Sequence, residues 1–394
     1  MISCNNLEKN MESKQATFGS DLSFLSYHTD VVVLSDSSGG AQIIVIPSMQ
    51  ARVMTSTLTD PDGLSHGWIN RELIASGKQL DHFNPYGGED RFWLGPEGGQ
   101  FSIFFKKDSE FNLENWYTPS AIDTEPFDLV SRDRSKASFR KSIHLVNYSG
   151  THFDVEVERE IRLLSTKEIA SVLGVSPEDS VHVVAFQSDN KIVNSGQDPW
   201  TKERGLLSIW ILGMFKPSPF TTIVIPFQED QHKDLGPIVN DTYFGKVPAD
   251  RLRIGEEVIY FKGDGNYRSK IGLSPQRAEP VLGSYDEVNQ VLTLVHYTKP
   301  NGSLDYVNSM WEIQEEPFRG DVVNSYNDGP PEPGSKPLGP FYELETSSPA
   351  AELEPADSLS HIHRTFHFKG RETQLDKIAI STLGKSIEKI KSAF

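Results

Sequence analysis

The stretch that decides the fold runs from residue 341 to residue 370 and reads FYELETSSPAAELEPADSLSHIHRTFHFKG. Side chains alternate between the two faces of an extended strand, so Glu343 and Glu345 point to the same side. Prolines then interrupt the pattern, because proline has no N–H to donate to a neighbouring strand. Residues 360–368 resume the alternation. The stretch therefore predicts two strands joined by a turn, with two carboxylates on one face.

This stretch resembles the C-terminal signature of aldose 1-epimerases and of the wider galactose mutarotase-like family. The resemblance rests on Leu344-Glu345-Thr346, on Leu353-Glu354-Pro355 after a short spacer, and on His363-x-Thr365-x-x-Phe368. In those enzymes a glutamate on the equivalent strand takes the proton of the sugar's anomeric hydroxyl, and a histidine protonates the ring oxygen. The resemblance implies that Glu345 is the base. The alternative interpretation is a solvated edge strand with charged residues.

Charge and hydropathy restrict the partners of this chain of 394 residues. Its 38 Lys and Arg residues against 55 Asp and Glu residues give a formal net charge of -17. Such a charge repels a phosphate backbone, so we expect no nucleic-acid partner. The longest apolar run, residues 206–215, is shorter than the ~20 residues that a membrane-spanning helix needs. We therefore expect no transmembrane segment.

The only cysteine is Cys4, which excludes an internal disulfide and a cysteine-based zinc cluster. Its setting, Met1-Ile2-Ser3-Cys4-Asn5, is similar to the end of a bacterial lipoprotein signal, whose cysteine is lipidated after cleavage. The charged start and apolar core of such a signal are missing. We expect an exported protein, periplasmic or lipid-anchored, if Cys4 is the remnant of such a signal, and a cytoplasmic protein otherwise.

The order of patterns along the chain predicts three parts. Residues 1–29 are polar and read as a flexible leader. Residues 30–370 carry short apolar, β-branched runs separated by turns, with one helix at residues 165–175. The resemblance implies a large antiparallel β-sandwich for this part, so the predicted class is all-β with a few short helices. Residues 371–394 have apolar residues near helical spacing and read as a helical extension.

A second stretch with functional character, residues 82–100, reads HFNPYGGEDRFWLGPEGGQ. Its glycines let a ligand approach the backbone closely. Glu89, Arg91, Trp93 and Glu97 supply acceptors, a planar donor fork and an aromatic face, which is the mixture that sugars need. Because mutarotase-like proteins carry substrate-contacting residues on a loop in this region, we predict that these four residues bind substrate. The alternative is a tight loop with an internal Arg–carboxylate pair.

The acid for ring opening is absent from the place where the family implies it. Aldose 1-epimerases carry a Thr-Asn-His-type element there, whereas here Asn194 is followed by Ser195. His363 and His296 are the remaining candidates for this acid. Asn194 and Asn327 are candidate substrate-binding residues, although each also suits a plain turn.

Three histidines on one strand face, His361, His363 and His367, could share a metal ion with Glu343. Hydrogen bonding and support of the cleft is the competing interpretation, which the family resemblance favours. The glycine-rich stretches match no phosphate-binding fingerprint. We therefore predict neither a metal nor another cofactor.

The expected function is that of a carbohydrate-binding, carbohydrate-active protein that acts near the anomeric carbon of a mono- or oligosaccharide. A non-catalytic carbohydrate-binding module is one alternative, which the missing Asn-His element favours. A lyase or hydrolase on the same scaffold is another, and it requires a paired acid and base that the sequence does not locate.

Overall fold

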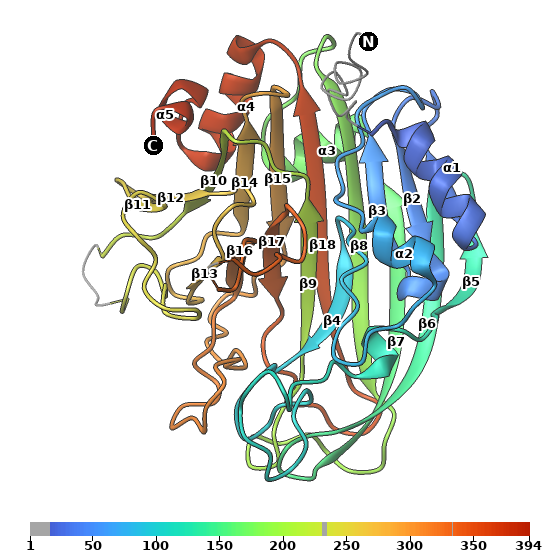
Figure 1. Cartoon of the computed structure of the whole chain (residues 1–394), viewed down its shortest axis with the longest axis vertical. Coiled ribbons are helices and arrows are strands. Elements are labelled where there is room, and N and C mark those ends of the chain that lie inside the picture. The colour runs from blue at the N-terminus through green and yellow to red at the C-terminus, as the bar shows by residue number, and fades with distance from the viewer. Residues whose placement is uncertain (1–15, 231–234, 333) are drawn as a thin grey trace, which may run out of the picture.

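Alternating apolar side chains fold most of the chain into antiparallel strands, and two large sheets pack face to face (Figure 1). The computed structural model describes residues 16–230, 235–332 and 334–394. One sheet has ten strands in the order β11-β12-β10-β14-β15-β18-β8-β7-β6-β5, and the second has five in the order β13-β16-β17-β9-β4. A third sheet has the order β1-β2-β3. The predicted all-β sandwich with a few short helices is confirmed.

The elements have the following bounds. The strands are β1 Val32–Ser35, β2 Gln42–Ile46, β3 Arg52–Thr57, β4 Arg91–Gly95, β5 Asp128–Arg132, β6 Lys136–Val146, β7 His152–Leu163, β8 His182–Asn194, β9 Ser208–Phe215, β10 Thr221–Pro226, β11 Leu252–Ile254, β12 Val258–Lys262, β13 Ser269–Leu273, β14 Val281–Asp286, β15 Val291–Tyr297, β16 Val323–Asn327, β17 Tyr342–Ser347 and β18 Ser358–Lys369. The helices are α1 Phe18–His28, α2 Arg71–Ser76, α3 Thr166–Leu173, α4 Glu372–Leu383 and α5 Ile387–Lys391, with short 3-10 turns η1 Pro47–Met49 and η2 Ser120–Ile122.

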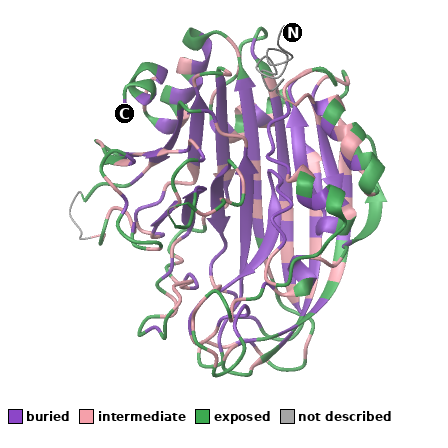
Figure 2. Cartoon of the chain, in the orientation of Figure 1, coloured by how far each residue is buried: buried purple, intermediate pink, exposed green. Residues whose placement is uncertain are grey.

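The core lies between the ten-stranded and the five-stranded sheet. Phe92 and Ile211 of the smaller sheet belong to one buried cluster with Val157 and Phe186 of the larger sheet. Figure 2 shows the strands of both sheets buried along most of their length. Because neighbouring residues of a strand face opposite ways, the smaller sheet turns its other face away from this core.

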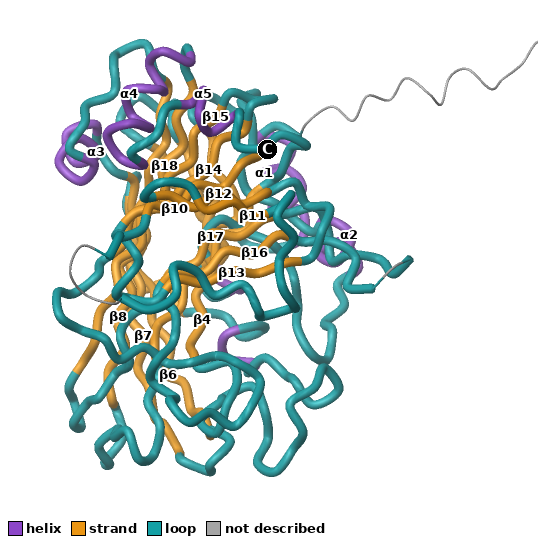
Figure 3. The backbone as a smooth tube through the Cα atoms, turned by 90° about the vertical axis from the view of Figure 1, so that its left-hand side faces the viewer, coloured by secondary structure: helices purple, strands orange, loops and turns teal. Residues whose placement is uncertain are grey.

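The helices α3, α4 and α5 cover the other face of the ten-stranded sheet. Ile169 of α3 and Leu375 of α4 pack with Leu294 and Phe366 of the strands. Helix α3 begins at the predicted place, where Ser165 and Glu168 form a capping box. Figure 3 shows α3, α4 and α5 at one end of the molecule and long loops at the other. No helix within the described residues is long and apolar enough to cross a membrane.

Residues 16–29 were expected to be part of a flexible leader. They contain the helix α1 instead. Residues 1–15, with Cys4, lie outside the described residues. Phe18 and Leu25 of α1 are fully buried in a cluster with β2 and α2 residues. The polar composition of the segment concealed this helix, since the single acidic residue of the helix is buried as well.

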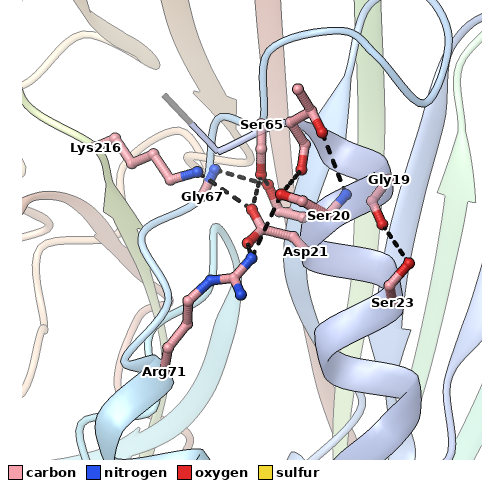
Figure 4. A network of polar contacts seen from close by, with 10 residues as sticks. Gly19, Ser20, Asp21, Ser23, Ser65, Gly67, Arg71 and Lys216 are labelled. Carbon is pink, nitrogen blue, oxygen red and sulfur yellow. Dashed lines mark hydrogen bonds and ion pairs between the residues drawn. The ribbon is translucent and has the colours of Figure 1, made fainter. Parts of the chain in front are cut away.

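That residue, Asp21, is 1% exposed and connects α1 to three other segments of the chain (Figure 4). Its carboxylate accepts a hydrogen bond from the Ser65 hydroxyl and forms an ion pair with Arg71. Lys216 Nζ lies 3.3 Å from Asp21 Oδ2. Three partners from separate segments therefore converge on a single buried carboxylate.

Replacing Asp21 by Ala is expected to lower the free energy of unfolding by about 1–3 kcal/mol, because the buried Ser65 and the partly buried Arg71 and Lys216 lose their acceptor. Urea denaturation measures this change, and hydrogen exchange reports whether α1 opens first. Ser23→Ala is the matched control, since the exposed Ser23 hydroxyl bonds only to Gly19 within the same helix. Equal stability of the two variants would contradict a fastening role for Asp21.

Candidate functional site

The face of the five-stranded sheet that points away from the core forms the floor of a cleft of about 760 Å³. The strands β4 and β9 contribute side chains at alternate positions, and β13, β16 and β17 contribute one side chain each. The floor residues that line the cleft are Arg91, Trp93, Trp210, Leu212, Met214, Lys270, Tyr326 and Glu343.

The strand register brings residues from distant parts of the chain into rows across the floor. Glu343 is paired with Met214 on one side and with Tyr326 on the other, and Tyr326 is paired with Lys270. In the adjacent row Leu212 lies between Arg91 and Glu345. Antiparallel partners on one face are close enough for their side chains to interact.

Aromatic rings form a continuous wall from the floor into the loops around the cleft. The ring of Trp210 lies 5.5 Å from that of Trp93, and Trp93 lies 5.5 Å from Phe83. Phe83 is 5.9 Å from Trp116, and Trp116 is stacked 5.9 Å from Trp311. The cleft thus offers ring faces along one side.

Glu343 is a carboxyl group that lines the cleft and favours its protonated form. Its Oε1 accepts a hydrogen bond from Arg91 Nη2 at 3.1 Å. Burial raises the pKa of Glu343 to about 8, with Arg91 acting against this shift and Glu345 adding to it. A group with a pKa near neutrality can both donate and accept a proton under physiological conditions.

Glu345, two residues along the strand from Glu343, forms an ion pair with Lys270. Its Oε2 accepts hydrogen bonds from Trp210 Nε1 and Lys270 Nζ, each at 3.0 Å. Burial lowers the pKa of Lys270, but the nearby carboxylates outweigh it and the pKa rises, so the ammonium stays charged. Glu345 itself is fully buried, below the surface that lines the cleft.

A third carboxyl group, Glu97, shares this environment. Burial raises its pKa, and the charge of Lys270 acts against that shift. Three carboxyl groups, Glu97, Glu343 and Glu345, therefore stand against the two cations Arg91 and Lys270. One carboxyl group without a counter-charge is consistent with a proton held by Glu343.

Several buried polar atoms around the cleft have no partner among the described residues. They are Arg91 Nε and Nη1, Trp93 Nε1, Trp116 Nε1 and Glu345 Oε1. Buried polar groups are normally hydrogen-bonded, so a concentration of unpartnered ones at one place marks it as a candidate for ligand binding. Four of these five atoms are donors, and the fifth is an acceptor.

Among the residues predicted from sequence, the structure brings Arg91, Trp93 and Glu97 together in the lining of the cleft. Glu345 lies next to them beneath the floor, bonded to Trp210 and Lys270.

Three predicted substrate-binding residues are placed elsewhere, which corrects their expected position. Glu89 accepts a hydrogen bond from Ser56, and its Oε2 also lies 2.8 Å from His367 Nε2, so its carboxylate serves the interior. Asn194 donates to the carbonyl oxygens of residues 198 and 353 and holds a turn. Asn327 faces the opposite side of β16 from the cleft-lining Tyr326. None of the three lines the cleft.

The two candidate acids, His363 and His296, are also away from the cleft. His363 Nδ1 lies 2.8 Å from the hydroxyl of Thr346, which points to the opposite side of β17 from Glu345. His296 lies 3.2 Å from Arg364 on the ten-stranded sheet. Burial lowers the pKa of each histidine to about 4. Neither histidine is placed to protonate a ligand in the cleft.

Two of the three histidines of β18 share one hydroxyl partner, and the third bonds elsewhere, so the three do not converge on one point. His361 and His363 both contact the Thr346 hydroxyl, and His367 contacts Thr293 and Glu89. Within the described residues, no group of three His, Cys, Asp or Glu side chains is arranged to hold a metal ion.

Sequence reasoning missed Lys270 and the aromatic residues Trp116, Trp210 and Trp311. It placed Glu343 on the same strand face as Glu345 but considered it only as a metal ligand. The alternation of β17 was the available signal for Glu343. The segment around Lys270 carries no pattern that separates it from an ordinary short strand.

Solved structures with a similar architecture identify the fold of this protein. The Slr1438 protein of Synechocystis sp. PCC 6803 superposes with a TM-score of 0.53 at 13% sequence identity, over 87% of this chain and 96% of that chain. An Escherichia coli K12 protein, provisionally named an aldose 1-epimerase, gives a TM-score of 0.52 at 11% identity, over 86% and 98%. The galactose mutarotase-like fold that the sequence predicted is confirmed, and the chain is a divergent example of it.

The family itself follows from sequence. Residues 16–394 match the model of a family of unknown function, DUF6786, and the chain belongs to that family. No curated protein is similar enough in sequence to match the chain.

Replacing Lys270 by Met is expected to lower the free energy of unfolding by about 3–5 kcal/mol, because the buried Glu345 loses its counter-charge. Adding Glu345→Gln in the same chain is expected to restore most of this loss. Lys336→Met is the control, since the Lys336–Glu72 pair is exposed and contributes little. Urea denaturation of the variants measures the coupling, and equal losses in the single and double variants would refute it.

Proposed function

We propose that this protein is a carbohydrate-active enzyme that acts near the anomeric carbon of a mono- or oligosaccharide, as mutarotases do. One observation carries the proposal. Glu343, whose pKa is about 8, lies on the floor of a cleft walled by aromatic rings, and the lysine-bound Glu345 lies directly beneath this floor. This arrangement supplies an acid and a base next to surfaces that suit a sugar.

The walls of the cleft fit the two kinds of surface that a sugar presents. Its hydroxyl groups require donors and acceptors, which the unpartnered atoms of Arg91, Trp93 and Glu345 provide. Its C–H faces pack on aromatic rings, and Trp93 and Trp210 present such rings at the floor. The fold supports the same reading, although fold alone does not establish an activity.

Two proton transfers account for the interconversion of anomers. Glu345 takes the proton of the anomeric hydroxyl, the bond between the anomeric carbon and the ring oxygen breaks, and the ring oxygen takes the proton of Glu343. Rotation of the open aldehyde and reversal of these steps closes the ring on the other face. Glu343 thus fills the part that the family gives to a histidine.

The burial of Glu345 favours one alternative, a non-catalytic carbohydrate-binding protein. Since Glu345 Oε1 is buried, a sugar hydroxyl reaches it only after side chains of the floor shift. A site that cannot make this shift would bind sugars on the floor without transferring protons.

The anomer interconversion of a panel of aldoses, followed by polarimetry or NMR exchange, tests the proposal. We expect acceleration by the protein and a loss of about 10²–10⁴-fold in each of Glu343→Gln and Glu345→Gln. Glu312→Gln is the matched control, because Glu312 is exposed and lies outside the cleft lining. No acceleration together with saturable sugar binding by calorimetry would favour the binding protein.

The pH dependence of this activity reports on Glu343. The acid must carry its proton, and a pKa of about 8 means that the proton is present below this pH and lost above it. We therefore expect kcat/KM to fall as the pH rises through about 8, by about tenfold per further pH unit. In Glu343→Gln this limb of the profile should vanish from the residual activity. If the fall of activity above about pH 8 stays unchanged in Glu343→Gln, a group other than Glu343 causes it.

A further inference from the structure

We propose that the sugar bound by this cleft carries an aromatic substituent on the side of the ring remote from the anomeric carbon. The inference rests on the proposed function, because the carboxyl groups of the floor determine which end of the sugar points inward. It adds a substrate class that neither the fold nor the acid–base pair implies.

The cleft changes in character from its floor to its mouth. At the floor, the lining residues are buried and include the charged Arg91, Lys270 and Glu343 beside aromatic and aliphatic side chains. At the mouth, the lining residues include four large apolar side chains that are exposed to solvent: Leu80 at 48%, Leu113 at 61%, Phe244 at 44% and Leu338 at 49%. They come from four loops that lie far apart in the sequence, and the charged side chains of Asp81, Glu114, Arg268 and Lys336 line the cleft as well.

The aromatic wall connects the two levels. Trp93 and Trp210 are buried at the floor, whereas Phe83, Trp116 and Trp311 are half-buried above them. Each ring is within 6 Å of the next, as the distances between ring centres show. A ligand that fills the cleft therefore meets ring faces beyond the region that the first sugar ring occupies.

An apolar group fits the half-buried rings and the leucines at the mouth better than a second sugar does. Exposed apolar side chains are ordinary when scattered, but several around one concave site mark a ligand-binding groove. A second sugar ring would place hydroxyl groups against the ring faces and the leucines, which offer them no polar partner. A flat aromatic group stacks on Trp116 and Trp311 and excludes water from the leucines at the mouth.

The direction of the sugar fixes the place of the substituent. When the anomeric carbon lies at Glu343 and Glu345, the oxygens on carbons 4 and 6 of an aldohexose lie on the opposite side of the ring. That side faces the mouth. The substituent is therefore attached at one of these two oxygens, and the anomeric hydroxyl remains free for reaction.

A matched pair of ligands tests the proposal by titration calorimetry of the whole chain. The compounds 4,6-O-benzylidene-D-glucose and 4,6-O-ethylidene-D-glucose differ only in a phenyl group against a methyl group, and both have a free anomeric hydroxyl. The galactose pair is measured alongside. We expect the benzylidene compound of at least one sugar to bind about tenfold more tightly. Maltose and cellobiose supply a second sugar at carbon 4 instead.

Variants above the floor test whether the aromatic wall and the leucines at the mouth cause the tighter binding of the benzylidene sugar. Trp311→Ala and Leu113→Ser are expected to reduce the benzylidene preference to less than about threefold. Ile313→Ser is the matched control, because Ile313 is 64% exposed on the same loop as Trp311 but does not line the cleft. The control should keep the full preference.

The outcomes separate this inference from the proposed function. Equal binding of the paired compounds, or tighter binding of maltose or cellobiose than of the benzylidene sugar, would overturn the aromatic substituent while the acid–base proposal stands. Binding of benzyl alcohol with no binding of any sugar would overturn the proposed function, and this inference with it. A benzylidene preference that persists in both Trp311→Ala and Leu113→Ser would also overturn the assignment to the wall.

Discussion

The division of the five-stranded sheet into an apolar and a charged face is the constraint on which the rest of the structure depends. Phe92 and Leu344 point into the core, while Arg91 and Glu343, one residue away on the same strands, point into the cleft. A register shift by one residue would exchange the two faces. The position of the reactive side chains is therefore as firmly determined as the core itself.

The same division explains how the protein keeps several charges out of water. Isolated buried charges are strongly unfavourable, and removing one partner of a buried pair is more damaging than removing both. The floor solves this by contacts that each span one intervening strand. Arg91 of β4 bonds to Glu343 of β17 across β9, and Lys270 of β13 bonds to Glu345 of β17 across β16. The carboxyl groups still outnumber the cations, and this excess of negative charge contributes to the raised pKa of Glu343.

The sequence allowed the fold to be predicted because a period of two recurs along the strands and because the stretch around Glu345 matches a family signature. The same period placed Glu343 and Glu345 on one face. It could not show which face of β17 the histidines of β18 would meet, since that depends on how the two sheets stack. Lys270 escaped notice because it meets Glu345 only through strands 75 residues apart. Asp21 escaped because burial of an acidic residue in a helix depends on distant partners such as Lys216.

The loops that form the mouth of the cleft bear on how this family can diverge. The carboxyl groups are fixed on paired strands, where substitution disturbs both a core and a charge balance. Leu80, Leu113 and Leu338 project from separate surface loops, which tolerate insertions and exchanges far better than strands do. Loop variation can therefore change the apolar mouth of the cleft while the sheet keeps the charged floor in place, so that the two levels of the cleft can vary independently.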